Sequence, residues 1–183
     1  MDFKAIDLTL NHFNIEDKVL LADLLANTQQ QRFPVLNNIS AEQVSALLGA
    51  HKAEHGTGIG FIKDGYEDVL GFAGLHYLAD VELYETVCQL QPEFADRANY
   101  VIEYLVYEAF SNLGLDKVCA RALPGHTDEV VLKENGFVCL GERVFAEEGL
   151  ETIWNYYELE NEANMTSAEE RNSYATSDWD SIF

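Results

Sequence analysis

The stretch that decides the fold is residues 91–110, which read QPEFADRANYVIEYLVYEAF. An apolar, strand-like run over residues 81–90 leads into it. Apolar residues at helical spacing follow, namely Ile102, Leu105, Val106, Ala109, Phe110 and Leu113. The pattern predicts a strand, a short connector and a helix over about residues 96–114. Ligands often bind at such a turn, because the first amides of a helix lack partners.

Further elements are predicted on both sides of this stretch. Alternating or apolar runs predict strands over residues 3–8, 57–63, 69–78, 117–123, 137–145 and 152–159. Helical spacing predicts helices over residues 15–28, 40–55 and 127–135. Gly56 and Gly136 are placed to end two of these helices, and Gly65 is placed for a hairpin turn between the second and third strands.

Length and charge limit the function classes. A chain of 183 residues with 48% hydrophobic residues predicts one globular domain, over residues 1–160. The net charge of −21 repels nucleic-acid phosphates and anionic membranes, and no apolar run approaches the ~20 residues that span a bilayer. The charge is more compatible with a protein partner than with nucleic acid or a membrane. Such a partner could be a basic protein or another subunit of an assembly.

Neither the cysteines nor the histidines predict a metal site. Cys88, Cys119 and Cys139 each lie in an apolar run without a CxxC pair, which indicates buried thiols in a reducing compartment such as the cytoplasm or a viral particle. His51 and His55 match the zinc pattern H-x-x-E-H. No acidic third ligand is identifiable, so we expect an exposed polar helix face and no metal.

Four segments, taken in order, resemble signatures of the GCN5-related N-acetyltransferases (GNAT). They are GFAG at 71–74, the strand end at Gln91-Pro92, YEAFSNLGL at 107–115 and VLKENGF at 131–137. The branch that acetylates ribosomal-protein N-termini is the most similar. The resemblance implies the GNAT fold, an α/β fold with a mixed, mostly antiparallel sheet flanked by helices. It also implies acetyl-CoA as the cofactor of an active enzyme.

The coenzyme loop departs from the family pattern. In the family, the turn after the fourth strand reads Gln/Arg-x-x-Gly-x-Gly/Ala, and its amides hold the coenzyme pyrophosphate. When the chain is aligned with the family at the segment that contains Phe110, Gln91 takes the first position of this pattern. Phe94 and Asp96 then stand at its two glycine positions. The loop residues are Gln91, Phe94, Ala95, Asp96, Arg97 and Ala98. The Phe94 side chain would fill the space that the phosphates need, and the Asp96 carboxylate would repel a phosphate by ~1–4 kcal/mol. The alternative is that the loop takes another shape and Arg97 binds the phosphate.

The other family positions have also changed. The Asn-x-x-Ser pair that contacts the coenzyme in this branch corresponds to Gly125 and Asp128, and an aspartate has no hydroxyl proton to donate at neutral pH. The tyrosine acid of other branches corresponds to Leu132. Glu82 and Glu85, on opposite faces of the strand before the loop, are candidate general bases, although solvated strand carboxylates have the same pattern.

Residues 161–183 form an acidic, Ser/Asn-rich tail with an aromatic end. Trp179, Ile182 and Phe183 are candidate anchors for a protein partner. Two hypotheses follow. The first is a pseudoenzyme with no cofactor that serves as a binding or structural component of a larger assembly, for example a virion. The second is an active N-acetyltransferase that moves an acetyl group from acetyl-CoA to a primary amine.

Overall fold

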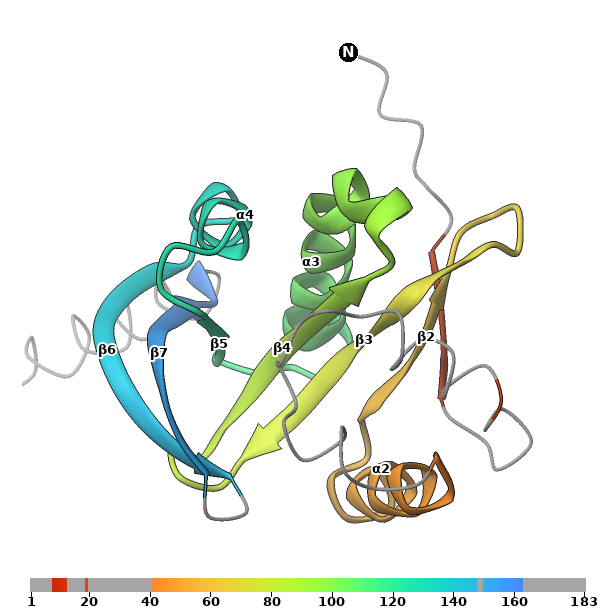
Figure 1. Cartoon of the computed structure of the whole chain (residues 1–183), viewed down its shortest axis with the longest axis horizontal. Coiled ribbons are helices and arrows are strands. Elements are labelled where there is room, and N and C mark those ends of the chain that lie inside the picture. Colours follow the sequence, from red (N-terminus) through yellow and green to blue (C-terminus); the bar gives the residue numbers. More distant parts are fainter. Residues whose placement is uncertain (1–7, 13–18, 20–40, 148–149, 163–183) are drawn as a thin grey trace, which may run out of the picture.

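Seven strands form one sheet in the order β1-β2-β3-β4-β5-β7-β6, in a computed structural model that describes residues 8–12, 19, 41–147 and 150–162 (Figure 1). The strands are β1 (Thr9–His12), β2 (Ile59–Lys63), β3 (Val69–Leu78), β4 (Leu83–Leu90), β5 (Lys117–Ala122), β6 (Val138–Glu147) and β7 (Leu150–Glu160). Among these described strands, only β4 and β5 pair in parallel. The predicted mixed, mostly antiparallel sheet is therefore confirmed. Most of the predicted first strand and the helix over residues 15–28 lie outside the described residues.

Helices cover both faces of the sheet. On one face, α3 (Ala98–Tyr107) and α4 (Asp128–Glu134) enclose the main core with strand residues such as Leu75, Val118 and Tyr157. On the other face, Leu48 of α2 (Ala41–His55) packs against Ile59, Phe72 and Val87. Among the described helices, none is long and apolar enough to cross a membrane.

The central helix is composite rather than one α-helix over residues 96–114. It begins as the 3₁₀ helix η3 (Pro92–Arg97), continues as α3 and ends as the π-helical turn η4 (Glu108–Asn112). Gly114 then adopts a φ of 67°, and the Leu115 N–H donates to Ala109 O at 2.9 Å. Within this π-helical turn, Ala109 is buried in the core cluster and Phe110 packs against it.

Asp64 organises the hairpin between β2 and β3. Its carboxylate Oδ1 accepts the N–H groups of Tyr66 at 2.9 Å and Asp68 at 3.2 Å. The left-handed residue is Glu67, with a φ of 66°, and not the glycine that we expected. The aspartate side chain replaces backbone partners in the turn, so a non-glycine residue tolerates this conformation.

The glycines of GFAG let three strands approach one another closely. An added Cβ at Gly71 would overlap Gln89 O of β4 and lie 2.7 Å from Leu90 Cα. An added Cβ at Gly74 would overlap Gly58 O beside β2.

The cysteines differ from one another, since Cys119 is buried, Cys88 is partly buried and Cys139 is exposed. The expectation of three buried thiols was therefore wrong for Cys139.

Candidate functional site

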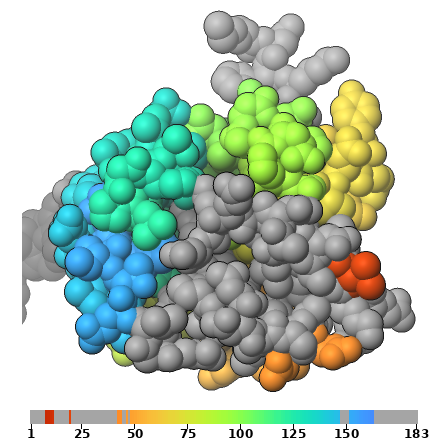
Figure 2. All heavy atoms as spheres, viewed as in Figure 1, coloured from red at the N-terminus to blue at the C-terminus, as the bar shows by residue number. Residues whose placement is uncertain are grey.

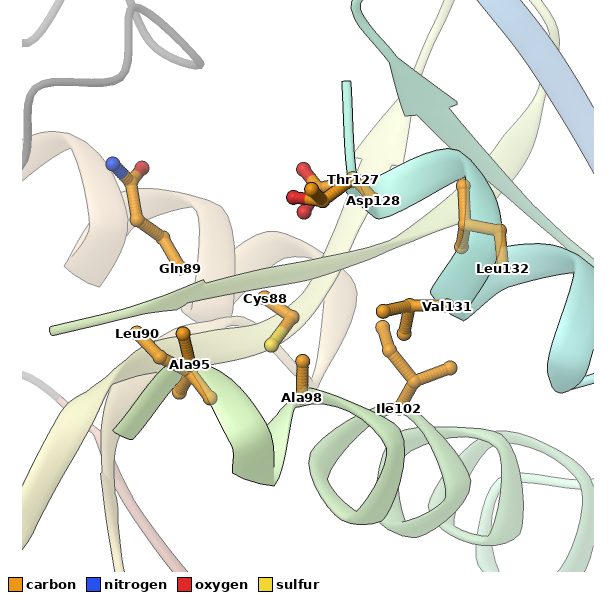
Figure 3. A pocket seen from close by; sticks show the side chains of 10 residues that line it. All are labelled: Cys88, Gln89, Leu90, Ala95, Ala98, Ile102, Thr127, Asp128, Val131 and Leu132. Atoms are coloured by element: carbon orange, nitrogen blue, oxygen red, sulfur yellow. The ribbon is translucent and has the colours of Figure 1, made fainter. Parts of the chain in front are cut away.

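A cavity of about 320 Å³ lies where β4 and β5 separate. The two strands pair only at Tyr84 with Val118 and at Glu85 with Cys119, so the carboxyl end of β4 diverges from β5. The ends of η3, α3 and α4 close the gap (Figure 3). The cavity is lined by Cys88, Gln89, Leu90, Ala95, Ala98, Ile102, Thr127, Asp128, Val131 and Leu132. Its size and mostly apolar walls are those of a small-molecule site.

Two of the six predicted loop residues, Ala95 and Ala98, line the cavity. The Phe94 side chain packs against the main core cluster. Small side chains leave space for a ligand at this wall. The Phe94 ring is half-buried against the core cluster, where packing of apolar surface is favourable.

The backbone amides of η3 are used within the helix. The Phe94 N–H donates to Gln91 O at 2.9 Å and the Ala98 N–H donates to Ala95 O, as the i to i+3 pattern of a 3₁₀ helix requires. The Gln91 side chain donates from Nε2 to Val69 O at 2.6 Å. Gln91 therefore joins the loop to β3, and this bond occupies its amide nitrogen.

The charges beside η3 are unfavourable for phosphate. Arg97 Nη1 lies 3.9 Å from Oδ2 of the buried Asp64, which is a long ion pair beyond hydrogen-bond distance. Asp96 lines a groove of about 770 Å³ outside the contact between α3 and α4. Figure 2 shows green atoms of the η3 region beside teal atoms of the α4 region.

Carboxylates dominate this groove. Its described lining residues include Asp96, Glu103 and Glu134 and no Lys or Arg. Asn99 Nδ2 donates to Glu134 Oε2 at 2.8 Å and joins the two helices there. A diphosphate near these carboxylates would be repelled, so the residues present do not fit the coenzyme pyrophosphate.

The start of α4 is held by Glu129, which the sequence analysis did not single out. Its carboxylate accepts the Gly125 N–H at 2.6 Å, the Tyr157 hydroxyl at 3.0 Å and Asn155 Nδ2 at 3.1 Å. These bonds, with the Gly125 amide first, lower the pKa of Glu129. The Gly125 amide is thus engaged at the position where the resemblance places a coenzyme contact.

Thr127 and Asp128 supply the polar end of the cavity. Figure 3 shows their side-chain oxygens together, across the cavity from Ala98 and Ile102. Asp128 Oδ2 lies 3.2 Å from His126 Nδ1. Thr127 occupies the N-cap position of α4 but makes no capping bond with its side chain. The sequence places Thr127 at the start of the predicted helix over residues 127–135, but it does not identify this threonine as a site residue.

The two candidate bases have different surroundings. Glu82 is exposed in the turn before β4 with a φ of 55°, so it does not lie on the strand as expected. Glu85 is 5% exposed and binds Arg121 with both oxygens, Oε1 to Nε at 2.7 Å and Oε2 to Nη2 at 2.9 Å. Arg121 also lies over the Phe145 ring. A carboxylate held in this way is poorly available to accept a proton from an amine.

The histidines of α2 form a ring cluster with the sheet. His51 stacks on His76 with ring centroids 4.6 Å apart, and the Tyr77 N–H donates to His51 Nε2 at 2.9 Å. The described residues contain no group of three or more His, Cys, Asp or Glu with the geometry to hold a metal. His51 thus has a structural role in joining α2 to β3.

Acidification is expected to destabilise this cluster. Burial, followed by the neighbouring His76 and His55, lowers the pKa of His51 from 6.5 to about 4. Between these two values the unfolded chain binds more protons than the folded chain. The stability that His51 contributes is therefore complete above pH 6.5 and is lost as the pH falls toward about 4. As the pH is lowered across this range, the urea midpoint of unfolding should fall less steeply for His51→Gln than for the natural chain. The glutamine keeps an acceptor for the Tyr77 N–H. Equal slopes of urea midpoint against pH for the two proteins would contradict this contribution of His51.

Comparisons with known proteins were made by sequence and by structure. A scan against protein-family models finds no match, and a search of curated proteins finds none either. Solved structures match over nearly their whole length. A spermidine N-acetyltransferase from Vibrio cholerae, in complex with CoA and spermine, has a TM-score of 0.67 and 18% identity, over 86% of this chain and 98% of that one.

Two further solved structures have a similar fold. A candidate acetyltransferase has a TM-score of 0.68 and 22% identity, over 85% of this chain and 94% of the other. A candidate ribosomal-protein-serine acetyltransferase from Vibrio cholerae also has a TM-score of 0.68, with 11% identity, over 87% and 98% of the two chains. With the strand order and the separation of β4 from β5, these matches establish that the chain has the fold of the GNAT acyl-CoA N-acyltransferases.

Proposed function

We propose that this protein uses the acetyltransferase fold for binding and not for acetyl transfer from acetyl-CoA. The observation that carries the proposal is the set of charges around the expected coenzyme site. Asp128 lies in the cavity, Asp96, Glu103 and Glu134 line the adjoining groove, and the nearby guanidinium of Arg97 is paired with Asp64. Coenzyme A carries several phosphate charges, and Coulomb repulsion by these carboxylates opposes its binding.

The environment of Glu85 supports the same conclusion. A general base needs a free lone pair within reach of the proton that it removes. Glu85 uses both oxygens on Arg121, inside a pocket closed by Phe145 and Trp154. This geometry is typical of a structural ion pair.

A transfer assay tests the proposal. The full chain is incubated with acetyl-CoA and, in separate reactions, with spermidine or a peptide with an N-terminal serine, and the released thiol is measured. We expect no release above that of Ala98→Leu, which narrows the cavity. Saturable release by the natural chain that Ala98→Leu abolishes would establish acetyl transfer through this cavity and end the proposal.

The second candidate function is an active N-acetyltransferase. One observation favours it, namely that the small residues Ala95 and Ala98 line the helical wall of the cavity between β4 and β5. Acetyl-CoA would then have to bind through an altered phosphate contact. The transfer assay separates the two functions.

We also propose a protein partner for the acidic tail. The predicted anchors Trp179, Ile182 and Phe183 lie outside the described residues, so the support is the sequence pattern alone. Burying two large aromatic side chains contributes roughly 3–6 kcal/mol before ordering costs. Deleting residues 177–183 should weaken self-association or partner binding, measured by analytical ultracentrifugation and by melting. Unchanged association and melting, with Trp179 fluorescence that reports full solvent exposure, would remove this proposal.

A further inference from the structure

Stacked imidazole rings join α2 to the sheet. His51 and His55 lie one turn apart on α2, with ring centroids 4.6 Å apart. The His51 ring stacks on His76 of β3 and the His55 ring on Tyr77, each with centroids 4.6 Å apart. Tyr84 of β4 meets the His55 ring edge-on at 6.3 Å. Three of the five histidines of the chain therefore gather at one contact, between α2 and β3.

The docked position of α2 requires neutral histidines. His51 Nε2 accepts the Tyr77 N–H at 2.9 Å, so a proton on this nitrogen would place two donors against each other. His76 Nδ1 is buried and has no hydrogen-bond partner among the described residues, so a proton there would lack both an acceptor and water. Positive charges on two rings in contact would also repel each other. Protonation therefore favours any motion that returns these rings to water.

The charged groups around the rings do not offset this cost. Burial is the largest cause of the lowered pKa of both His51 and His76, and the third imidazole of the cluster lowers both further. On α2, Glu54 raises the pKa of His51 but is the last of its causes. On the sheet, Glu85 of β4 lies opposite His76 in the strand register and raises its pKa, while Arg121 of β5 lowers it.

We propose that acid releases α2 from the sheet while the rest of the domain stays folded. The inference goes beyond the proposed function, because neither the cavity nor the acidic groove takes part in it. Neutral histidines hold α2 in place above about pH 6.5, and the docked state loses population as the pH falls toward about 4. Release uncovers the apolar side chains against which Leu48 packs, namely Ile59, Phe72 and Val87. Acid thus controls access to an apolar face that can bind a partner.

The rest of the domain does not depend on these rings. The main core cluster lies on the other face of the sheet, under α3 and α4, and none of its described members is a histidine (Figure 1). A helix of 15 residues is marginal by itself in water, so α2 loses its amide protection once it leaves the sheet. Release of α2 and unfolding of the domain are therefore separate events that hydrogen exchange can distinguish.

Native-state hydrogen exchange of the full chain tests the release. After correction for intrinsic exchange rates, the protection of α2 amides should fall about 30-fold between pH 7.5 and pH 5, from the folded and unfolded pKa values of His51. Low urea should leave α2 protection nearly unchanged and should lower α3 protection. The reason is that local release exposes little surface and global unfolding exposes much.

Three variants assign the pH response to the cluster. His51→Gln keeps an acceptor for the Tyr77 N–H but takes up no proton, so the fall in α2 protection should shrink about tenfold or more. His76→Phe keeps a flat ring beside His51 and should also reduce the fall. The matched control His126→Gln removes a histidine at the start of α4 and should keep the whole fall. The protection of α3 at pH 7.5 shows that each variant is folded.

The proposal is overturned if α2 and α3 amides have the same protection and the same urea dependence, because α2 then leaves the sheet only when the domain unfolds. It is equally overturned if the natural chain and both cluster variants lose α2 protection to the same extent between pH 7.5 and pH 5. A fall that both cluster variants reduce and His126→Gln retains supports it.

Discussion

Replacing Glu85 with alanine should lower the free energy of unfolding by about 3–5 kcal/mol. The change leaves the Arg121 guanidinium, which is 2% exposed, without its bidentate partner and between the rings of Phe145 and Trp154. For a buried charge, the loss of a bidentate carboxylate is costly because water does not take its place. Urea unfolding, followed by circular dichroism, measures the loss.

Two further variants make this experiment specific. Glu160→Ala removes a carboxylate 2.9 Å from Lys117 at the surface, where ion pairs contribute only ~0–1 kcal/mol. The double variant Glu85→Leu/Arg121→Met removes both charges and should recover most of the loss, since apolar residues of similar volume often replace a buried pair well. Equal losses for Glu85→Ala and Glu160→Ala would show that the Glu85 pair has no structural role.

A second large effect is expected at Gly71, where alanine should cost about 4 kcal/mol or more. The new Cβ would overlap the Gln89 carbonyl oxygen, and the backbone of β4 cannot move away without breaking its pairing with β3. Thermal melting of the purified variant, or its failure to accumulate as folded protein, measures the effect.

The matched control is Gly49→Ala in α2. An added Cβ at Gly49 has no heavy atom within 4 Å, and alanine in a helix interior is more favourable than glycine by roughly 0.5–1 kcal/mol. Gly49→Ala should therefore raise the melting temperature while Gly71→Ala lowers it. Similar melting of the two variants would contradict the close packing of β3 against β4.

The sequence could predict most of the fold because periodicity and glycines mark the elements. The pattern of residues 69–78 and of Ile102, Leu105 and Ala109 identifies β3 and the buried face of the central helix. Gly136, with a φ of 84°, ends α4 as expected. Local signals of this kind do not depend on distant partners, so they can be read along the chain.

The site was harder to predict, because its geometry depends on helix phase and on distant contacts. A 3₁₀ helix has three residues per turn, so the conformation of η3 decides which loop residues face the cavity, and these are Ala95 and Ala98. Phe94 is the one aromatic residue in a mostly polar connector, and this pattern could have predicted that it packs against the core. Arg121, the one cation within the apolar run VCARA at 118–122, was the signal for a buried partner, but its pairing with Glu85 spans 36 positions.

The central claim is that the expected coenzyme site no longer accepts acetyl-CoA, and the melting temperature of the full chain with and without acetyl-CoA tests it most directly. A ligand present at a hundredfold excess over its Kd adds about 2.7 kcal/mol of stability, which is easily measured as a melting shift. We predict no shift at millimolar acetyl-CoA, and a gain of binding in Asp96→Gly/Asp128→Ser, which removes two carboxylates from the groove and the cavity. A clear upward shift of the natural chain at millimolar or lower acetyl-CoA would contradict the claim.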